Sequence, residues 1–154
     1  MDQKPKKPFS VYLLRFLIIF IAASGLMGGL SFLISPSGEL LQIPLSLLNN
    51  TPFDNYLIPG IILLICIGLY PTIVSFGLFN RKENPLLNSV NLYKENHWSW
   101  TGSVYIGIML IIWMDVQVML IGYNAIIQFI YAILGVLTVI CALIPSVKNF
   151  YLKR

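Results

Sequence analysis

The feature that most constrains this chain is a set of four long apolar runs. They cover approximately residues 11–33, 57–78, 100–121 and 125–145. Each approaches the roughly 20 residues that a helix needs to cross about 30 Å of hydrocarbon. Backbone groups in lipid must bond within their own segment, and the runs lack the period-two alternation of barrel strands. The sequence therefore predicts an all-α membrane protein, a four-transmembrane-helix bundle formed by a single domain, residues 1–154.

Composition supports this fold class. The chain is 57% hydrophobic and only 10% charged, whereas soluble domains have roughly 45–50% apolar and about 25% charged residues. So few charges cannot cover a water-exposed surface, which excludes soluble classes. The net charge is +4, but the basic residues are dispersed and accompany no nucleic-acid-binding motif. We therefore expect no nucleic acid among the partners.

The basic residues predict the orientation. All ten lie on the same side of the four spans: Lys4, Lys6, Lys7, Arg15, Arg81, Lys82, Lys94, Lys148, Lys153 and Arg154. The connections 34–56 and 122–124 contain none. The positive-inside rule then predicts a multi-pass protein of the cell membrane with both termini and the 79–99 loop in the cytoplasm. The first run is predicted to be an uncleaved span rather than a signal peptide, because it continues past the small residues "IAAS".

The connection 34–56 is too apolar for a free linker. Three of its leucines, Leu41, Leu45 and Leu48, recur at helical spacing and predict a short helix lying on the outer membrane surface. Thr51 and Pro52 are typical of a helix start. The second span is therefore predicted either to start at Thr51 and bend at Pro59, or to restart at Pro59.

The 79–99 loop ends in a histidine beside two tryptophans. Trp98 and Trp100 are predicted to anchor the third span at the membrane interface. His97 is expected to be a solvated side chain, and no second histidine exists to share a metal. Cys66 and Cys141 are predicted to lie at different depths and to act as small apolar packing residues.

Small and polar residues mark the faces on which the spans should meet. The fourth span shows Gln128, Tyr131, Gly135, Thr138 and Ala142 at spacings of three and four. The second shows Gly60, Leu64, Gly68, Pro71 and Ser75. In the first, Gly25 and Gly29 form a Gly-x-x-x-Gly pattern, which favours contact between two helices of this chain over a dimer interface.

One acidic residue, Asp115, interrupts the third span, in "IIWMDVQVMLIGY" (111–123). Asp115 lies eight residues before Tyr123 in the turn, and Tyr131 lies eight residues after Tyr123. An antiparallel helix pair would therefore bring Asp115 and Tyr131 to the same depth. A charge at a helix centre costs roughly 2.5–3.5 kcal/mol. Asp115 is therefore expected to be buried, sheltered by the fourth span, and hydrogen-bonded to Tyr131, Gln128 or water. Either it joins helices, or it binds a proton or ligand in a cavity opening outward.

The stretch "PSGELLQIPLSLLNNTPFDNYLIPGIILL" (36–64), together with the four-span layout, resembles a group of small bacterial membrane proteins. Their arrangement is similar to that of the DoxX-like proteins, which are four-helix bundles with a glycine-rich first span and a structured first loop. The second span here has no acidic residue, unlike the DoxX pattern. The resemblance therefore implies the architecture and no catalytic residue.

Three functions remain open. The first is a non-catalytic accessory or apolar-ligand-binding protein with an outward-facing pocket lined by Asp115, Tyr131 and Gln128. The second is a membrane enzyme or redox partner acting on a quinone or lipid, with Asp115 as acid or base. The third is a proton-coupled transporter. Membrane lipid, an apolar small molecule and a second copy of the chain are the expected partners, and neither a metal nor a cofactor is predicted.

Overall fold

The computed structural model describes residues 8–153, so four of the basic residues above, Lys4, Lys6, Lys7 and Arg154, lie outside the described residues. Four helices are long and apolar enough to cross a membrane, as expected of a multi-pass protein: α1 (Phe9–Ile34), a second span (Leu57–Asn80), α5 (Trp98–Ile121) and α6 (Ile126–Leu143). Apart from one isolated bridge, the described residues contain no β-structure. The predicted all-helical architecture is confirmed.

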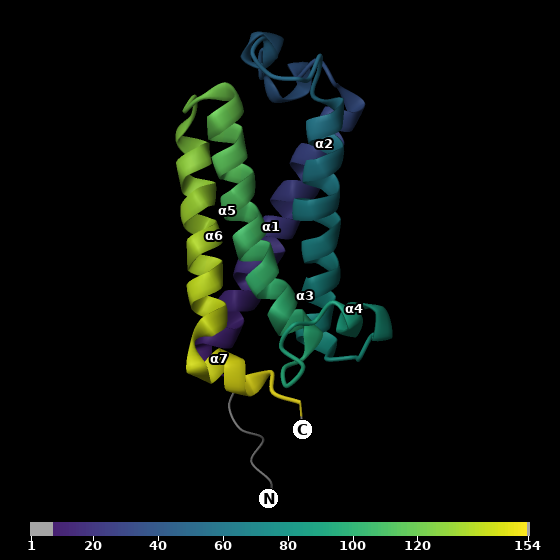
Figure 1. Ribbon diagram of the computed structural model, residues 1–154, viewed down its shortest axis with the longest axis vertical. Coiled ribbons are helices and arrows are strands. Elements are labelled where there is room, and N and C mark those ends of the chain that lie inside the picture. Colours follow the sequence, from purple (N-terminus) through teal and green to yellow (C-terminus); the bar gives the residue numbers. More distant parts are fainter. Residues whose placement is uncertain (1–7, 154) are drawn as a thin grey trace, which may run out of the picture.

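The second span is divided into α2 (Leu57–Leu63), the π-helical turn η3 (Leu64–Leu69) and α3 (Tyr70–Asn80). The shorter elements are η1 (Glu39–Leu41), η2 (Leu45–Leu48), α4 (Pro85–Ser89) and α7 (Pro145–Phe150). We call the end of the bundle that carries the start of α1, α4 and α7 the terminal end. The opposite end, with η1, η2 and the turn 122–125, is the loop end (Figure 1).

The second span begins at Leu57, so a start at Thr51 is wrong. The Thr51 hydroxyl instead closes a local turn by donating to the Leu48 carbonyl at 2.9 Å. Asn55 accepts a hydrogen bond from the Leu57 N–H at 2.9 Å. Pro59 consequently lies in the first turn of α2, where a helix needs no N–H, so it does not break the span.

The first loop forms two 3₁₀ turns, η1 and η2, on either side of Pro44, rather than one short helix. Of its predicted apolar edge, only Leu48 is buried, and Leu41 and Leu45 are exposed. The Tyr56 ring stacks on Phe32 with centroids 4.8 Å apart, and its hydroxyl donates to the Pro44 carbonyl at 2.9 Å. The loop is thereby held over the end of α1 and the second span.

The glycines of α1 touch the second span, in agreement with the predicted contact between two helices of this chain. A Cβ on Gly25 would stand 2.2 Å from the Ile67 carbonyl oxygen, and one on Gly29 would stand 2.6 Å from Leu64 Cβ. Both contacts fall on η3, where Ile67 and Gly68 are buried. The Gly-x-x-x-Gly pattern is therefore an internal helix contact, which rests on backbones close enough to exclude a methyl group.

Glycines also allow α5 and α6 to pack closely against each other. A Cβ on Gly107 would lie 2.8 Å from the Gly135 carbonyl oxygen, and one on Gly135 would lie 2.9 Å from that of Gly107. The stripe predicted on the fourth span is confirmed at Gln128, Gly135, Thr138 and Ala142, which are buried, whereas Tyr131 is half-buried. α1 and the second span form one helical hairpin, and α5 and α6 form the other. α5 packs against α3 near the terminal end, and the two hairpins diverge toward the loop end (Figure 1).

The two tryptophans that open α5 are buried, so their prediction as interface anchors is wrong. Trp98 is 7% exposed and Trp100 is fully buried. Their indole N–H groups donate to the Lys82 carbonyl at 2.9 Å and to the Ala142 carbonyl at 2.8 Å. The loop before α5 is bridged to the C-terminal segment at Asn96 and Leu152, and Tyr93 of this loop packs edge-on against Trp100 with ring centroids 5.4 Å apart. A long-range pairing of this kind leaves no periodic trace in the sequence.

A buried cation joins three elements at the terminal end. Arg15 is 5% exposed, and its Nη2 donates to the Leu78 carbonyl at 2.6 Å while its Nε donates to the Tyr151 hydroxyl at 3.2 Å. Leu78 lies in the last turn of α3, where the helix dipole is negative and carbonyls lack helical partners. Arg15 of α1 therefore caps α3 and fixes the C-terminal segment after α7 against both helices.

Candidate functional site

The structure places Asp115 in a shallow groove between α5 and α6 near the loop end. The groove has a volume of about 240 Å³. Besides Asp115, its lining consists of Ile111, Met114, Val118, Tyr123, Gln128, Phe129 and Ala132. Two of the three residues predicted for the site, Asp115 and Gln128, therefore share this groove. Tyr131 does not line it and packs against the buried core.

The expectation that α6 shelters Asp115 is wrong. Asp115 is exposed on the lateral surface of the bundle, and it forms no hydrogen bond or ion pair with any residue between 8 and 153. The expected orientation of the two helices is the part that fails. Neighbouring residues on a helix point about 100° apart, and α6 presents Phe129 and Ala132 to this groove while Tyr131 turns to the core.

Gln128 forms its hydrogen bonds with the backbone of the turn 122–125 and not with Asp115. Its Oε1 accepts from the Asn124 N–H at 3.0 Å and from the Ala125 N–H at 3.3 Å, and its Nε2 donates to the Gly122 carbonyl at 3.3 Å. These bonds satisfy backbone groups at the start of α6 that have no partner within the helix. Gln128 therefore acts as a helix cap.

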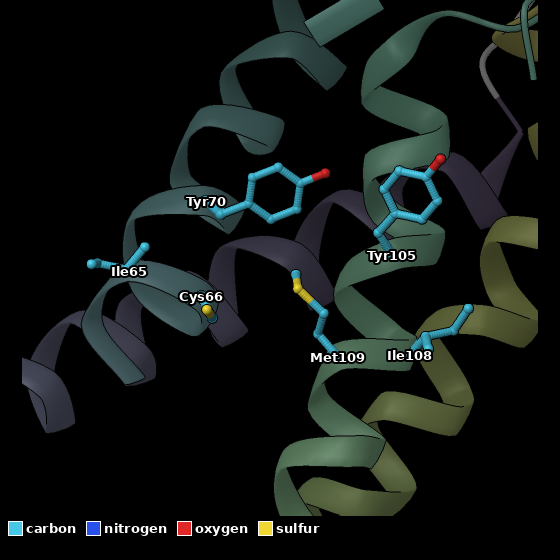
Figure 2. Close-up of a pocket in the computed structure, with 6 residues that line it drawn as sticks. All are labelled: Ile65, Cys66, Tyr70, Tyr105, Ile108 and Met109. Atoms are coloured by element: carbon cyan, nitrogen blue, oxygen red, sulfur yellow. The ribbon is translucent and has the colours of Figure 1, made fainter. Parts of the chain in front are cut away.

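A second and larger groove lies between the second span and α5 (Figure 2). Its volume is about 420 Å³, and it is open on one side. Six residues line it: Ile65, Cys66, Tyr70, Tyr105, Ile108 and Met109. We call it the Tyr70 groove. Tyr70 lies about 15 Å from the end of the span at Asn80, at about 1.5 Å per residue, which places the groove near the middle of the membrane-spanning segments.

The position of this groove follows from one glycine. A Cβ on Gly102 would stand 2.7 Å from Val74 Cγ2 and 3.2 Å from the Tyr70 hydroxyl oxygen. Gly102 thus lets α3 and α5 touch on the terminal side of Tyr70. Beyond that contact the two hairpins separate toward the loop end (Figure 1), and the space that opens between them is the groove.

The two tyrosines of the groove differ in their hydrogen bonds. The Tyr105 hydroxyl donates to the Val90 carbonyl at 3.0 Å and accepts from the Leu92 N–H at 3.3 Å, which ties α5 to the loop before it. The Tyr70 ring points across the groove toward α5 (Figure 2). Its hydroxyl has no partner among residues 8–153. A hydroxyl left unpaired in an apolar medium is costly, so the groove offers one unused donor.

Sequence reasoning did not find this groove, although one signal was present. Tyrosines of membrane helices are enriched at the two interfaces, and Tyr70 lies instead near mid-span. Cys66 lines the groove, whereas Cys141 is buried, and both are free thiols. Cys141 is therefore a packing residue, as predicted. Residues 8–153 contain no group of three or more His, Cys, Asp or Glu side chains that could hold a metal.

His97 is buried, so the prediction of a solvated side chain is wrong. Its Nδ1 accepts from the Ser99 N–H at 3.3 Å, which caps α5, and its Nε2 donates to the Lys82 carbonyl at 3.2 Å. Burial lowers the pKa of His97, because the charged imidazolium loses its hydration, and the Glu83 carboxylate at 3.9 Å opposes this only in part. A neutral histidine with both nitrogens engaged has a structural role.

No protein-family model, characterised protein or solved structure matches this chain. The resemblance to the DoxX-like proteins therefore stays a prediction.

Proposed function

We propose that this protein is a non-catalytic membrane protein that binds an apolar molecule carrying a carbonyl-type acceptor in the Tyr70 groove. The observation that carries the proposal is the Tyr70 hydroxyl, which faces an apolar groove without a partner among residues 8–153. A carbonyl oxygen on an apolar chain would accept that hydrogen bond. Isoprenoid quinones and the acyl esters of lipids share this chemistry.

The size and lining of the groove support binding. Small-molecule sites usually measure about 300–1,000 Å³ and combine apolar walls with few polar groups, and the Tyr70 groove has about 420 Å³. Two residues of its lining, Ile65 and Ile108, are exposed on membrane-spanning helices. A ligand dissolved in the bilayer would enter from the side, place its apolar part against Cys66, Ile108 and Met109, and offer its carbonyl to Tyr70.

The same lining favours binding over catalysis. A proton-transfer site usually pairs two titratable groups whose environments separate their proton affinities. The titratable groups of the Tyr70 groove are two phenols and one thiol. Asp115, the acid or base of the alternative enzymatic hypothesis, lines the other groove. We therefore favour a carrier or accessory role.

Photocrosslinking in reconstituted vesicles tests the proposal. Two probes are used: a phosphatidylcholine with a diazirine in one acyl chain, and an isoprenoid quinone with a diazirine in its tail. The preferred probe should label peptides around Cys66 and Met109. Tyr70→Phe should lower that labelling about tenfold, since one hydrogen bond in an apolar site contributes roughly 1.4 kcal/mol. Tyr12→Phe is the matched control, because Tyr12 is a 54% exposed tyrosine of α1 outside the groove.

A second pair of variants tests whether labelling requires the open volume of the Tyr70 groove. Met109→Trp should fill the groove and abolish labelling there. Ile112→Trp adds an indole to the same helix at a position that is 56% exposed and lines neither groove, so it should change nothing. Labelling spread evenly over the lipid-facing surfaces, or unchanged in both Tyr70→Phe and Met109→Trp, would refute the proposal.

We also propose that the terminal end faces the cytoplasm of a cell membrane. The support is the distribution of charge, because all ten Lys and Arg residues belong to the termini, the first turns of α1 or the connection 81–97. Fusions at the C-terminus report the orientation. Green fluorescent protein should fluoresce there and alkaline phosphatase should be inactive, and the reverse result would overturn the assignment.

A further inference from the structure

Asp115 occupies an unfavourable place for a carboxylate. It lies six residues before the end of α5 at Ile121, which is about 9 Å along the helix axis. Side chains on a helix lean toward its N-terminus, and α5 begins at the terminal end (Figure 1). The Asp115 side chain therefore leans toward the middle of the membrane. A short aspartate cannot reach the headgroups as a long lysine or arginine side chain does.

The surface around Asp115 is apolar. Ile112 is 56% exposed, Met119 is 76% exposed and Phe129 is 54% exposed. The groove of about 240 Å³ beside the carboxyl provides a recess into which a neighbouring side chain would fit. This combination of an exposed apolar helix pair, a recess and one unpaired acid differs from a surface adapted to lipid alone, because lipid tails offer no hydrogen-bond donor.

We propose that the face of α5 and α6 around Asp115 binds a transmembrane helix of another protein that carries a lysine or arginine in the loop-end half of the bilayer. Charge complementarity identifies this partner. An isolated charge in hydrocarbon is unfavourable, whereas an ion pair with good geometry in the same medium is strongly attractive. The recess would receive the long apolar stem of the basic side chain, and the carboxylate would bind its cationic head.

A second copy of this chain fits the face less well. The six Lys and Arg residues between 8 and 153 all belong to the opposite end of the bundle, so the described part of a copy with the same orientation brings no cation to this depth. It would bring its own Asp115 together with neutral polar side chains such as Gln117, Tyr123 and Gln128, and two aspartates in contact repel each other. The phosphate groups of lipids carry the same sign of charge as Asp115 and are equally unsuitable.

The test uses defined peptides and the purified full chain in lipid vesicles. One peptide is a polyleucine helix of about 20 residues with a single lysine six residues before one end, and its control has leucine there. Energy transfer between dyes on the chain and on the peptide measures association. The chain should bind the lysine peptide at least about tenfold more tightly than the leucine peptide.

Three variants decide the interpretation. Asp115→Asn should abolish the preference for lysine, and Asp115→Lys should transfer it to a peptide with aspartate at the same position. Gln117→Leu is the control, because Gln117 lies on the same helix but lines neither groove. Since Asp115 has no partner among residues 8–153, Asp115→Asn should unfold at the same temperature as the parent chain.

Several results would overturn the inference. Equal affinity for the lysine and leucine peptides would show that the face does not recognise a cation. Retention of the preference in Asp115→Asn would place the recognition elsewhere. Energy transfer between two differently labelled copies, lost on Asp115→Asn, would assign the face to self-association. None of these measurements involves Tyr70, so they are independent of ligand binding in the Tyr70 groove.

Discussion

Replacement of Gly25 by alanine tests the glycine contact with the shortest Cβ distance among residues 8–153. The new Cβ would stand 2.2 Å from the Ile67 carbonyl oxygen and 2.7 Å from the Gly68 nitrogen. Ordinary contact begins near 3.4 Å, so α1 and the second span would have to separate locally by about 1.2 Å. The obstructing atoms belong to the backbone and cannot rotate away. Overpacking of this kind costs about 1–3 kcal/mol.

Gly28→Ala is the matched control on the same helix. Its Cβ would meet only the Leu63 Cδ2 methyl, at 3.0 Å, and a methyl at the end of a flexible side chain can move. Both substitutions gain the same helix propensity, about 0.5–1 kcal/mol. The difference between the two variants therefore isolates the clash. We expect Gly25→Ala to be less stable than Gly28→Ala by about 2 kcal/mol, a factor of roughly 30 in the folded-to-unfolded ratio.

The measurement is unfolding in mixed micelles with increasing sodium dodecyl sulfate, followed by the fluorescence of the buried Trp98 and Trp100. Gly68→Ala supplies an intermediate case, because its Cβ would stand 3.0 Å from the Leu26 nitrogen. The three variants should rank as Gly25→Ala, Gly68→Ala and Gly28→Ala in order of increasing stability. Equal stability of Gly25→Ala and Gly28→Ala would refute the argument that close backbone packing on η3 joins these helices.

Three further predictions concern the terminal end, and the same unfolding assay checks each. Burial holds the pKa of His97 in the folded protein below its ordinary 6.5. As the pH falls, the unfolded chain therefore takes up a proton at His97 before the folded protein does. The free energy of unfolding should fall as the pH drops below about 6.5 and level off below the folded-state pKa. His97→Asn keeps the cap and should remove this pH dependence, and a dependence that persists would implicate another group. Arg15→Lys should cost about 1–3 kcal/mol, since lysine lacks the planar guanidinium fork whose Nη2 and Nε reach the Leu78 carbonyl and the Tyr151 hydroxyl separately; unchanged stability would contradict this. Asn91→Ala should cost about 2–3 kcal/mol, because it leaves the Asn96 carbonyl and the Thr101 hydroxyl without their buried partner, and a loss much below about 1 kcal/mol would show that water replaces it.

Much of the fold could be predicted because it follows from local rules. A membrane-spanning segment must satisfy its backbone within one helix, so the length of an apolar run already determines the number and the approximate limits of the spans. The contact faces were also accessible, because Gly25, Gly29 and Gly135 permit an approach that any side chain would prevent. These properties depend on the residue itself and on its spacing along one helix.

Most of the candidate sites could not be predicted in this way. Asp115 and Tyr131 were expected to face each other, yet Asp115 is exposed and Tyr131 turns to the core. His97 and its two neighbouring tryptophans look like interface residues in sequence and are buried in the structure.

The four apolar helices and their contacts at Gly25, Gly29 and Gly135 follow from the sequence alone, as does the position of its basic residues on one side of the spans. Which polar side chains have partners depends on how the helices pack: Arg15 caps α3, whereas Asp115 and the Tyr70 hydroxyl have no hydrogen-bond partner among residues 8–153. The physical reason is that helix formation and charge distribution are properties of the segments. The rotation of each helix, the divergence of the two hairpins and the folding of the loops over their ends result from the packing of all segments together.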